Sequence, residues 1–302
     1  MTQLAALPSG RPQRIAYLGT PKVAVPPLEA LVAAGFDVVL VVTRIDKRRG
    51  RGSDVTPSPV KEAAHKLGLT VSHEVNDLLE VEADLGVVVA FGQLIKPHVL
   101  AKLAMVNLHF SLLPRWRGAA PVERALLAGD EVTGVCLMQL GEGLDDGPIL
   151  DVVEVPIQRR DLATELRDRL VDAGTRQLIA ALRTGLGESH EQVGEVTYAA
   201  KLHPDEFRID WHRSAVEVDR LVRLGVAWTE FRGKRLKVLA TEPTEALGAA
   251  GSFIDPLVIA CGAGSLTLVR VQPEGKPVMD AVSWANGARP NVHDQLSDSI
   301  AS

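Results

Sequence analysis

Short, continuously apolar segments alternate with helical segments through the first half of the chain, and this alternation constrains the fold more than any other feature. Four of these segments are rich in Val, Ile and Leu: 14–19, 37–43, 85–91 and 106–110. Strands that are apolar along their whole length are typical of parallel sheets covered on both faces. Between the strands lie stretches with helical patterns, 26–34, 58–67 and 97–103. The sequence therefore predicts an α/β fold with a doubly wound, Rossmann-like, mainly parallel sheet.

The pattern changes near residue 205. Before it, an amphipathic segment (162–182) is followed by a stretch interrupted by Gly, His and Pro. After it come one helical segment and short apolar strands separated by Gly and Pro turns, which favour a small β-barrel. Because 302 residues are also long for one compact domain, we expect more than one. The predicted parts are an α/β catalytic domain, a linker and a C-terminal OB-like β-barrel domain, over residues 12–188, 189–206 and 207–302.

Composition and charge describe an ordinary globular protein. The formal net charge of -5 excludes a chain that coats nucleic acid by bulk positive charge. The two cysteines, Cys136 and Cys261, form neither a disulfide framework nor a Cys-x-x-Cys motif. The first dozen residues lack the apolar core of a signal peptide, and no apolar run has the length of a membrane span. We expect a cytoplasmic protein without membrane association and, since neither a coiled coil nor an obligate dimer seam is visible, a monomer.

The segment NLHFSLLPRWRGAAP, residues 107–121, carries the first candidate for chemistry. Asn107 and His109 lie two residues apart on a predicted strand, so their side chains point to the same face. They also lie at the carboxyl end of that strand, where α/β sheets bind ligands. A carboxylate that could orient the imidazole is available from Asp145 or Asp146, in the Gly-flanked loop GLDDG. An amide, an imidazolium and a carboxylate together suit acyl transfer, because they can stabilise an oxyanion and move a proton.

Each motif also has an ordinary structural interpretation. An Asn-x-His pair is often a capping amide beside a surface or core histidine, and Asp-Asp between glycines is commonly a turn. The functional interpretation is favoured because both segments fall at strand ends of one predicted sheet. The sequence contains no His/Cys cluster at metal-ligand spacing, no HExxH and no phosphate loop ending in GK[ST], so we expect no metal.

With these motifs in order, the chain resembles the folate-dependent formyltransferases, and more narrowly the branch of methionyl-tRNA formyltransferases. The pattern in that family is Asn-x-His, then Ser-Leu-Leu-Pro, then a Gly-x-Asp-x-Gly loop. Asn107, His109 and Asp145 are the matching residues here. The opening YLGTP, the segment 50–61, VTYAAKL and VQPEGKPVMDA are similar to the same family. The resemblance therefore covers almost the whole chain.

The resemblance implies a reaction and its participants. The formyl group comes from 10-formyltetrahydrofolate, a co-substrate, and the acceptor is the α-amine of initiator methionyl-tRNA, used in translation initiation. Asn107 and His109 would stabilise the tetrahedral oxyanion, and Asp145 would orient and charge His109 and assist proton transfer. The folate would be bound by residues of two segments: Phe91, Gly92, Gln93, Leu94, Ile95, Ser111, Leu112, Leu113 and Pro114.

The resemblance also implies which basic residues face tRNA. A long basic loop follows the second predicted strand, and Arg51 in its Gly-Arg-Gly matches the family arginine. Where relatives commonly have Gln-Pro-Asp-Arg-Pro, this chain has Arg-Ile-Asp-Lys-Arg at 44–48. Arg115 and Arg117 have two open interpretations, contact with the acceptor end or bracing of their own loop. The candidate tRNA-binding residues are Lys47, Arg48, Arg49, Arg51, Lys201, Lys234 and Arg235.

Rival functions use the same candidate catalytic residues. A formyltransferase acting on a small amine or nucleotide sugar, or a formyltetrahydrofolate hydrolase, would retain Asn107, His109 and Asp145 but lack or replace the basic loop and the barrel. A rival from another class is a non-catalytic tRNA-binding module with a vestigial folate site. An intact set of candidate catalytic residues argues against that module.

Overall fold

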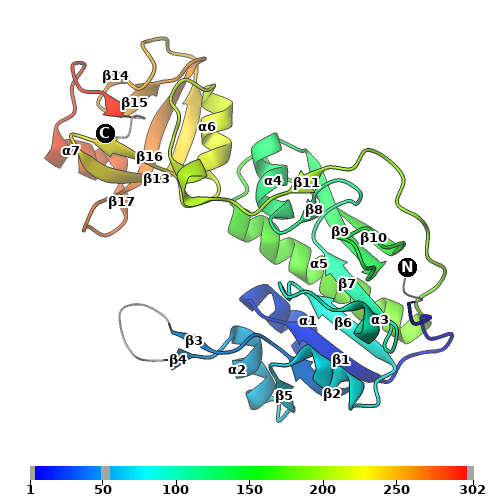
Figure 1. The fold of residues 1–302 in the computed structure, drawn as a ribbon. Helices are drawn as coiled ribbons and strands as arrows, with labels where there is room; N and C mark the ends of the chain where they lie inside the picture. The colour runs from blue at the N-terminus through cyan, green and yellow to red at the C-terminus, as the bar shows by residue number, and fades with distance from the viewer. Residues whose placement is uncertain (1–3, 49–54, 298–302) are drawn as a thin grey trace. The chain divides into compact units, whose positions relative to one another are not determined.

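The computed structural model describes residues 4–48 and 55–297, which form two compact units (Figure 1). The first unit consists of residues 1–122, 132–156 and 167–200. The second consists of residues 123–131, 157–166 and 201–302. Each unit has its own sheet, and the two are described separately below.

The sheet of the first unit has seven strands in the order β10-β9-β7-β6-β1-β2-β5. The five strands from β7 to β5 in this order pair in parallel, whereas β9 pairs antiparallel with both β7 and β10. This confirms the predicted doubly wound, mainly parallel sheet (Figure 1). The strand bounds are β1 Arg14–Gly19, β2 Asp37–Val42, β5 Val71–Ser72, β6 Leu85–Val89, β7 Met105–His109, β9 Val132–Gln139 and β10 Ile149–Pro156.

Several helices begin at residues that are favoured at helix N-termini. Helix α2 (Pro59–Lys66) begins after Ser58, whose hydroxyl accepts a hydrogen bond from the backbone N–H of Lys61 at 3.0 Å. Proline at the first helical position costs no hydrogen bond, because that N–H has no partner within a helix. The other α-helices before residue 200 are α1 (Val25–Ala33), α3 (Pro97–Leu100), α4 (Pro121–Ala128) and the long α5 (Ala163–Thr184).

The sheet of the first unit is buried on both faces. On one face, α3 and the 3-10 helix η2 (Val75–Leu79) pack over Ala16, Leu18 and Met105. On the other face, α5 approaches β9 closely at Gly174, where an added Cβ would lie 2.9 Å from a methyl group of Val135. This burial explains the continuously apolar strands on which the sequence prediction rested.

Asp84 ties the beginning of β1 to the residue before β6. Its Oδ2 accepts hydrogen bonds from the backbone N–H groups of Gln13 and Arg14, at 2.7 and 2.9 Å. The bonds from Arg14 and Gln13 hold the pKa of the Asp84 carboxyl below its ordinary value of 3.8. Because the folded pKa is the lower one, the stabilisation is fully present above the unfolded pKa and is lost as the pH falls through the folded pKa.

We expect Asp84→Asn to lower the free energy of unfolding by about 1 kcal/mol at neutral pH. The difference from the unsubstituted protein should shrink as the pH falls below 3.8, where the native carboxylate also becomes neutral. Urea unfolding at neutral and acidic pH measures both values. Glu82→Gln is the matched control, since Glu82 pairs with Arg14 but is 93% exposed and should contribute little. A difference between Asp84→Asn and the native chain that does not depend on pH would contradict this account.

The second unit is built on an antiparallel sheet. Its strand order is β14-β15-β16-β13-β12-β18, with β17 paired to β16. An isolated antiparallel bridge between Ser252 and Gln295 connects the two ends of this order, so the sheet curls into a small barrel. The predicted β-barrel is confirmed. The strand bounds are β12 Trp228–Phe231, β13 Lys234–Thr244, β14 Phe253–Asp255, β15 Val258–Ala260, β16 Ser265–Pro273, β17 Met279–Asp280 and β18 Leu296–Ser297.

Helices cover the core of this barrel. Helix α6 (Ala215–Val222) begins at a capping box formed by Ser214 and Glu217. Its residues join a core that contains Trp211 and Trp284, and helix α7 (Ala281–Ala288) also contributes to this core. The indole Nε1–H of Trp211 donates to Thr229 Oγ1 at 3.0 Å, which satisfies its one polar group in the interior.

Short elements complete the structure. Strands β3 (Lys47–Arg48) and β4 (Val55–Thr56) pair antiparallel at the base of the basic loop. Strands β8 (Arg117–Gly118) and β11 (Tyr198–Ala199) pair in parallel, and the 3-10 helices η1 and η3 span Lys22–Ala24 and Pro204–Phe207. Among the described residues, no helix combines the length and apolar character that crossing a membrane requires.

Candidate active site

Asn107 and His109 lie at the carboxyl end of β7, where the sheet changes from parallel to antiparallel pairing. Asn107 is opposite Val88 of β6 on one side and Met138 of β9 on the other. Both side chains are nearly buried, with 8% and 5% of their surface exposed, and both line one cavity. The alternation of side chains along a strand therefore places the amide and the imidazole on the same side, as the sequence predicted.

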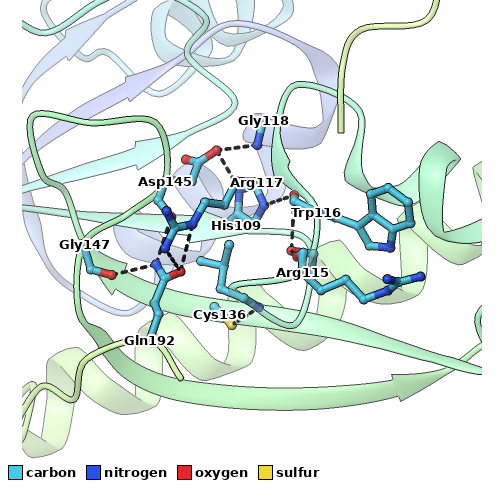
Figure 2. Close-up of polar contacts among 11 residues, drawn as sticks. His109, Arg115, Trp116, Arg117, Gly118, Cys136, Asp145, Gly147 and Gln192 are labelled. Carbon is cyan, nitrogen blue, oxygen red and sulfur yellow. Dashed lines mark hydrogen bonds and ion pairs between the residues drawn. The ribbon is translucent and has the colours of Figure 1, made fainter. Parts of the chain in front are cut away.

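Each ring nitrogen of His109 faces an acceptor oxygen. Nε2 lies 2.9 Å from the backbone oxygen of Trp116, and Nδ1 lies 3.5 Å from Asp145 Oδ2 (Figure 2). A neutral imidazole can donate from only one nitrogen, so the doubly protonated ring is the form that satisfies both neighbours. The side chains of His109 and Asp145 are 6% and 14% exposed, so this ion pair is largely shielded from water.

Asp145 is held in an unusual backbone conformation. Its φ is 48°, in the left-handed region that aspartate tolerates better than most residues. Its Oδ2 also accepts a hydrogen bond of 2.8 Å from the backbone N–H of Gly118. Gly118 has a φ of 116°, and an added Cβ would lie 3.0 Å from the backbone oxygen of Ala199. Glycine is required at this position both for its conformation and for the close approach of β11.

The cavity next to these residues has a volume of about 610 Å³. Its walls include Asn107, His109 and Asp145, together with the five candidate folate-binding residues of the strand-to-helix turn: Phe91, Gly92, Gln93, Leu94 and Ile95. Leu94 is 80% exposed, which is unusual for a leucine beside a cavity and suits a surface that an apolar ligand covers. The volume is in the range of sites that bind small organic molecules.

The other candidate folate-binding segment, Ser111 to Pro114, is not part of this lining. The hydroxyl of Ser111 donates to the backbone oxygen of Arg115 at 2.6 Å, and the backbone N–H of Leu113 donates to Cys136 Sγ at 3.3 Å. Ser111, Leu113 and Pro114 are buried, and Leu112 is half-buried. Burial raises the pKa of the Cys136 thiol to about 11, so this sulfur is a neutral packing group. The segment supports the wall behind His109.

The amide of Asn107 stands out in the cavity. Within residues 4–48 and 55–297, no group hydrogen-bonds to this side chain, although only 8% of the residue is exposed. The amide atoms of Asn107 are not among the fully buried polar atoms that lack a partner, so they are open to the cavity. Its donor and acceptor are therefore available to a ligand.

The candidate tRNA-binding residues are spread over the chain. The backbones of Lys47 and Arg48 form β3, while Arg49 and Arg51 lie outside the described residues. Lys201, Lys234 and Arg235 belong to the second unit and are exposed. The Arg235 guanidinium lies 4.3 Å from the ring centroid of Trp228, and Arg208 stacks on the same ring at 5.0 Å.

Two residues near Asp145 were not identified from the sequence, Arg117 as a support for the loop and Gln192. Figure 2 shows their side chains pointing toward one another beside the Asp145 loop. Gln192 lies in the stretch between α5 and β11, which has no periodic pattern. Its role depends on contacts between residues far apart in the chain, and no local signal in the sequence identifies it. Among the described residues, no group of three or more His, Cys, Asp or Glu side chains is placed to hold a metal.

Comparison with known families shows which family the chain belongs to. A family model described as formyl transferase matches residues 13–182, and a model of the formyl transferase C-terminal domain matches residues 201–289. The chain belongs to the formyl transferase family. Members of this family are transferases, so the protein is an enzyme.

Curated relatives of this formyl transferase confirm the narrower resemblance. A methionyl-tRNA formyltransferase of Jannaschia sp. is 43% identical over 91% of this chain and 97% of its own length. One of Caulobacter vibrioides is 44% identical over 91% of this chain and 96% of its own length. Another, of Neisseria meningitidis, is 40% identical, again over 91% of this chain and 97% of its own length. The resemblance to methionyl-tRNA formyltransferases is thus confirmed.

Solved structures share the fold of this formyl transferase. An N-formyltransferase from Helicobacter canadensis, in complex with folinic acid and dTDP-3-aminofucose, has a TM-score of 0.66 at 18% identity, covering 84% of this chain and 98% of its own. HypX from Aquifex aeolicus, in complex with tetrahydrofolic acid, has a TM-score of 0.62 at 14% identity, covering 91% of this chain and 47% of its own.

Proposed function

We propose that this enzyme transfers a formyl group from 10-formyltetrahydrofolate to the α-amine of initiator methionyl-tRNA. The observation that carries the proposal is the partnerless amide of Asn107 beside the His109–Asp145 pair, in one cavity of about 610 Å³. The names of the curated relatives, at 40–44% identity over 91% of this chain, support methionyl-tRNA as the acceptor.

The chemistry follows from the residues at the cavity. The neutral α-amine attacks the formyl carbon, a C–N bond forms, and the carbonyl electrons move onto oxygen. The N–H of Asn107 donates to this oxyanion, and the positive charge of the protonated His109 stabilises it. The tetrahedral intermediate collapses as the bond to folate N10 breaks. N10 takes up a proton, and the attacking nitrogen loses one to Asp145, directly or through water. A free α-amine has a pKa of roughly 7.7–8.0, so modest assistance produces the reactive form.

The folate ring system is proposed to lie along the turn from Phe91 to Ile95, with Leu94 against its flat face. Asn107, which has no protein partner among the described residues, is placed to meet the formyl oxygen. Ser111 to Pro114 would act by supporting this wall.

We expect Leu94→Ala to weaken folate binding by about 5- to 30-fold, because it removes roughly 1–2 kcal/mol of apolar contact. Titration with folinic acid, monitored by calorimetry, measures the dissociation constant. Leu247→Ala is the matched control, since Leu247 is 83% exposed but lies in the second unit. An equal dissociation constant for the Leu94→Ala and Leu247→Ala proteins would place the folate elsewhere.

The three parts of the chain are proposed to have different roles in this reaction. Residues 12–188 would hold the catalytic site, 189–206 would serve as the linker, and 207–302 would bind tRNA. Phosphate contacts would come from the candidate basic residues of all three parts, which are Lys47, Arg48, Arg49, Arg51, Lys201, Lys234 and Arg235. An enzyme that supplies initiator tRNA to ribosomes acts in the cytoplasm, and we propose that it acts there as a monomer.

The acceptor is tested by offering three amines with 10-formyltetrahydrofolate labelled in the formyl group. They are initiator methionyl-tRNA, elongator methionyl-tRNA and a dTDP-amino sugar. The proposal predicts label on the initiator tRNA, far ahead of the other two. Label on the sugar alone would assign the enzyme to a sugar-modifying branch, and formate release without an acceptor would make it a hydrolase.

A further inference from the structure

The loop that carries Asp145 is supported by two side chains outside the proposed chemistry. The side-chain amide nitrogen of Gln192 donates to the backbone oxygens of Asp145 and Gly147, each at 2.8 Å. Its amide oxygen accepts from Arg117, at 3.0 Å from Nε and 2.7 Å from Nη2 (Figure 2). Gln192 thus connects the chain on both sides of Asp146 to β8.

This arrangement uses the full hydrogen-bonding capacity of the Gln192 amide. Each of its N–H groups has a carbonyl partner, and its oxygen receives two bonds from one guanidinium. The reverse orientation would set the NH₂ group against Arg117 and the oxygen against two carbonyls. Arg117 and the two carbonyls therefore favour the same orientation of the amide, and loss of Arg117 removes the contacts on one side of it.

The segment that bears Gln192 is itself anchored on both sides. His190 exchanges backbone hydrogen bonds with Ile149 of β10, at 2.7 and 2.8 Å. Thr197 accepts from the backbone N–H of Trp116 through its hydroxyl at 2.9 Å, and its backbone oxygen accepts from Arg117 at 2.9 Å. Gln192 thus projects from a backbone held at both ends, which is the property a positioning residue needs.

Strand β8 meets Asp145 in two ways. The N–H of Gly118 binds the carboxylate at 2.8 Å, while Arg117, the residue before it, acts on the Asp145 backbone through Gln192. The left-handed conformation of Asp145, with φ at 48°, costs free energy in a free loop and persists where surrounding contacts enforce it. The bonds from Gln192 hold the backbone oxygen of Asp145 itself and that of Gly147, two residues later.

We propose that Gln192 is a positioning residue for Asp145 and that Arg117 holds Gln192 in the required orientation. The inference rests on the proposed function, in which the Asp145 carboxylate charges His109 and accepts a proton. We call the Gln192–Arg117 pair the clamp. Without it, the loop that carries Asp145 relaxes, and the carboxylate moves away from Nδ1 of His109. The proposal also assigns Arg117 a role in bracing the Asp145 loop through Gln192, in place of contact with the acceptor end.

The test is a double-mutant cycle of formyl transfer to methionyl-tRNA. Gln192→Leu removes all four hydrogen bonds, and we expect it to lower kcat by about 10- to 10²-fold with KM values little changed, since small misplacements of catalytic groups have effects of this size. In an Asp145→Asn background the same change should lower kcat little further. An equal loss in both backgrounds would mean a merely structural role and would overturn the proposal.

The kcat and KM values of Arg117 variants provide a second test of the same clamp. Arg117→Lys keeps a cationic donor for the Gln192 oxygen and should retain most of the kcat, whereas Arg117→Met should match Gln192→Leu. A rise in KM for tRNA with unchanged kcat in Arg117→Met would instead mark a tRNA contact and overturn the assignment.

Hydrogen–deuterium exchange gives a readout that does not depend on turnover. Gln192→Leu should speed amide exchange in the peptide covering 143–147 and leave β1 and β2 protected. Gln13→Leu is the matched control, because the side chain of Gln13 makes one hydrogen bond, of 3.3 Å, to the neighbouring Pro12 oxygen. Native protein that fails to formylate methionyl-tRNA would refute the proposed function alone. Unchanged amide exchange in the 143–147 peptide of the Gln192→Leu variant would refute the clamp.

Discussion

Replacing Asp145 with asparagine is expected to lower kcat by about 10²–10⁴-fold, the range of a general acid–base contribution. Asparagine keeps an oxygen that can accept the 2.8 Å bond from Gly118, so the loop retains its anchor. The negative charge beside Nδ1 of His109 is lost, and with it the acceptor of a proton in the proposed transfer. Steady-state formylation of methionyl-tRNA measures the loss, and folinic acid binding should remain close to that of the native protein.

Asp146→Asn is the matched control for this substitution. Asp146 is the next residue in the same loop, is exposed, and is not part of the cavity lining. We expect its replacement to leave kcat unchanged. Equal losses in the two variants, or full activity in Asp145→Asn, would remove Asp145 from the mechanism.

Replacing Asn107 with leucine is expected to lower kcat by about 10²–10³-fold, the usual effect of losing one oxyanion donor. The same change should leave the free energy of unfolding little changed, because the amide has no partner among the described residues and faces the cavity. Activity and stability should thus move independently, as expected of a residue kept for function. Formylation assays and urea unfolding measure the two effects.

Thr133→Val tests the same reasoning away from the cavity. Thr133 lies on β9 and is 2% exposed, and its hydroxyl oxygen has no hydrogen-bond partner in the described part of the chain. Valine should preserve or raise the free energy of unfolding and leave kcat intact. A loss of stability in Asn107→Leu as large as its loss of activity would mean that the amide holds the fold rather than the oxyanion.

The regular part of the fold could be predicted because its signals are local. Strands such as β2 and β6 are apolar along their whole length since both faces of the sheet are covered, and that is visible in the sequence. Strands β8 and β11 are two residues each, too short to have a period, and they exist because distant segments meet. For the same reason, the hydrogen bonds that join residues 190–199 to the rest of the first unit could not be predicted from a stretch rich in Gly, Glu and Val.

The candidate site divides in the same way. A strand's period of two placed Asn107 and His109 on one face, and the end of a parallel strand gave them a ligand-binding location. The sequence pointed to the GLDDG loop as the source of a carboxylate, and resemblance selected Asp145 within it. The contact with His109 itself depends on a left-handed residue and on the hydrogen bond from Gly118, which have no local signal. Gln192 could not be predicted, because its four bonds join three segments that are distant in the sequence.

The central claim is that formyl transfer to methionyl-tRNA takes place at Asn107, His109 and Asp145. The most direct test is a single-turnover experiment with enzyme in excess over labelled 10-formyltetrahydrofolate and charged initiator tRNA. The account predicts rapid transfer by the native protein and rates slower by about 10²-fold or more for Asn107→Leu, His109→Ala and Asp145→Asn, each still binding folinic acid. No transfer by the native protein, or transfer by all three variants at the native rate, would contradict it.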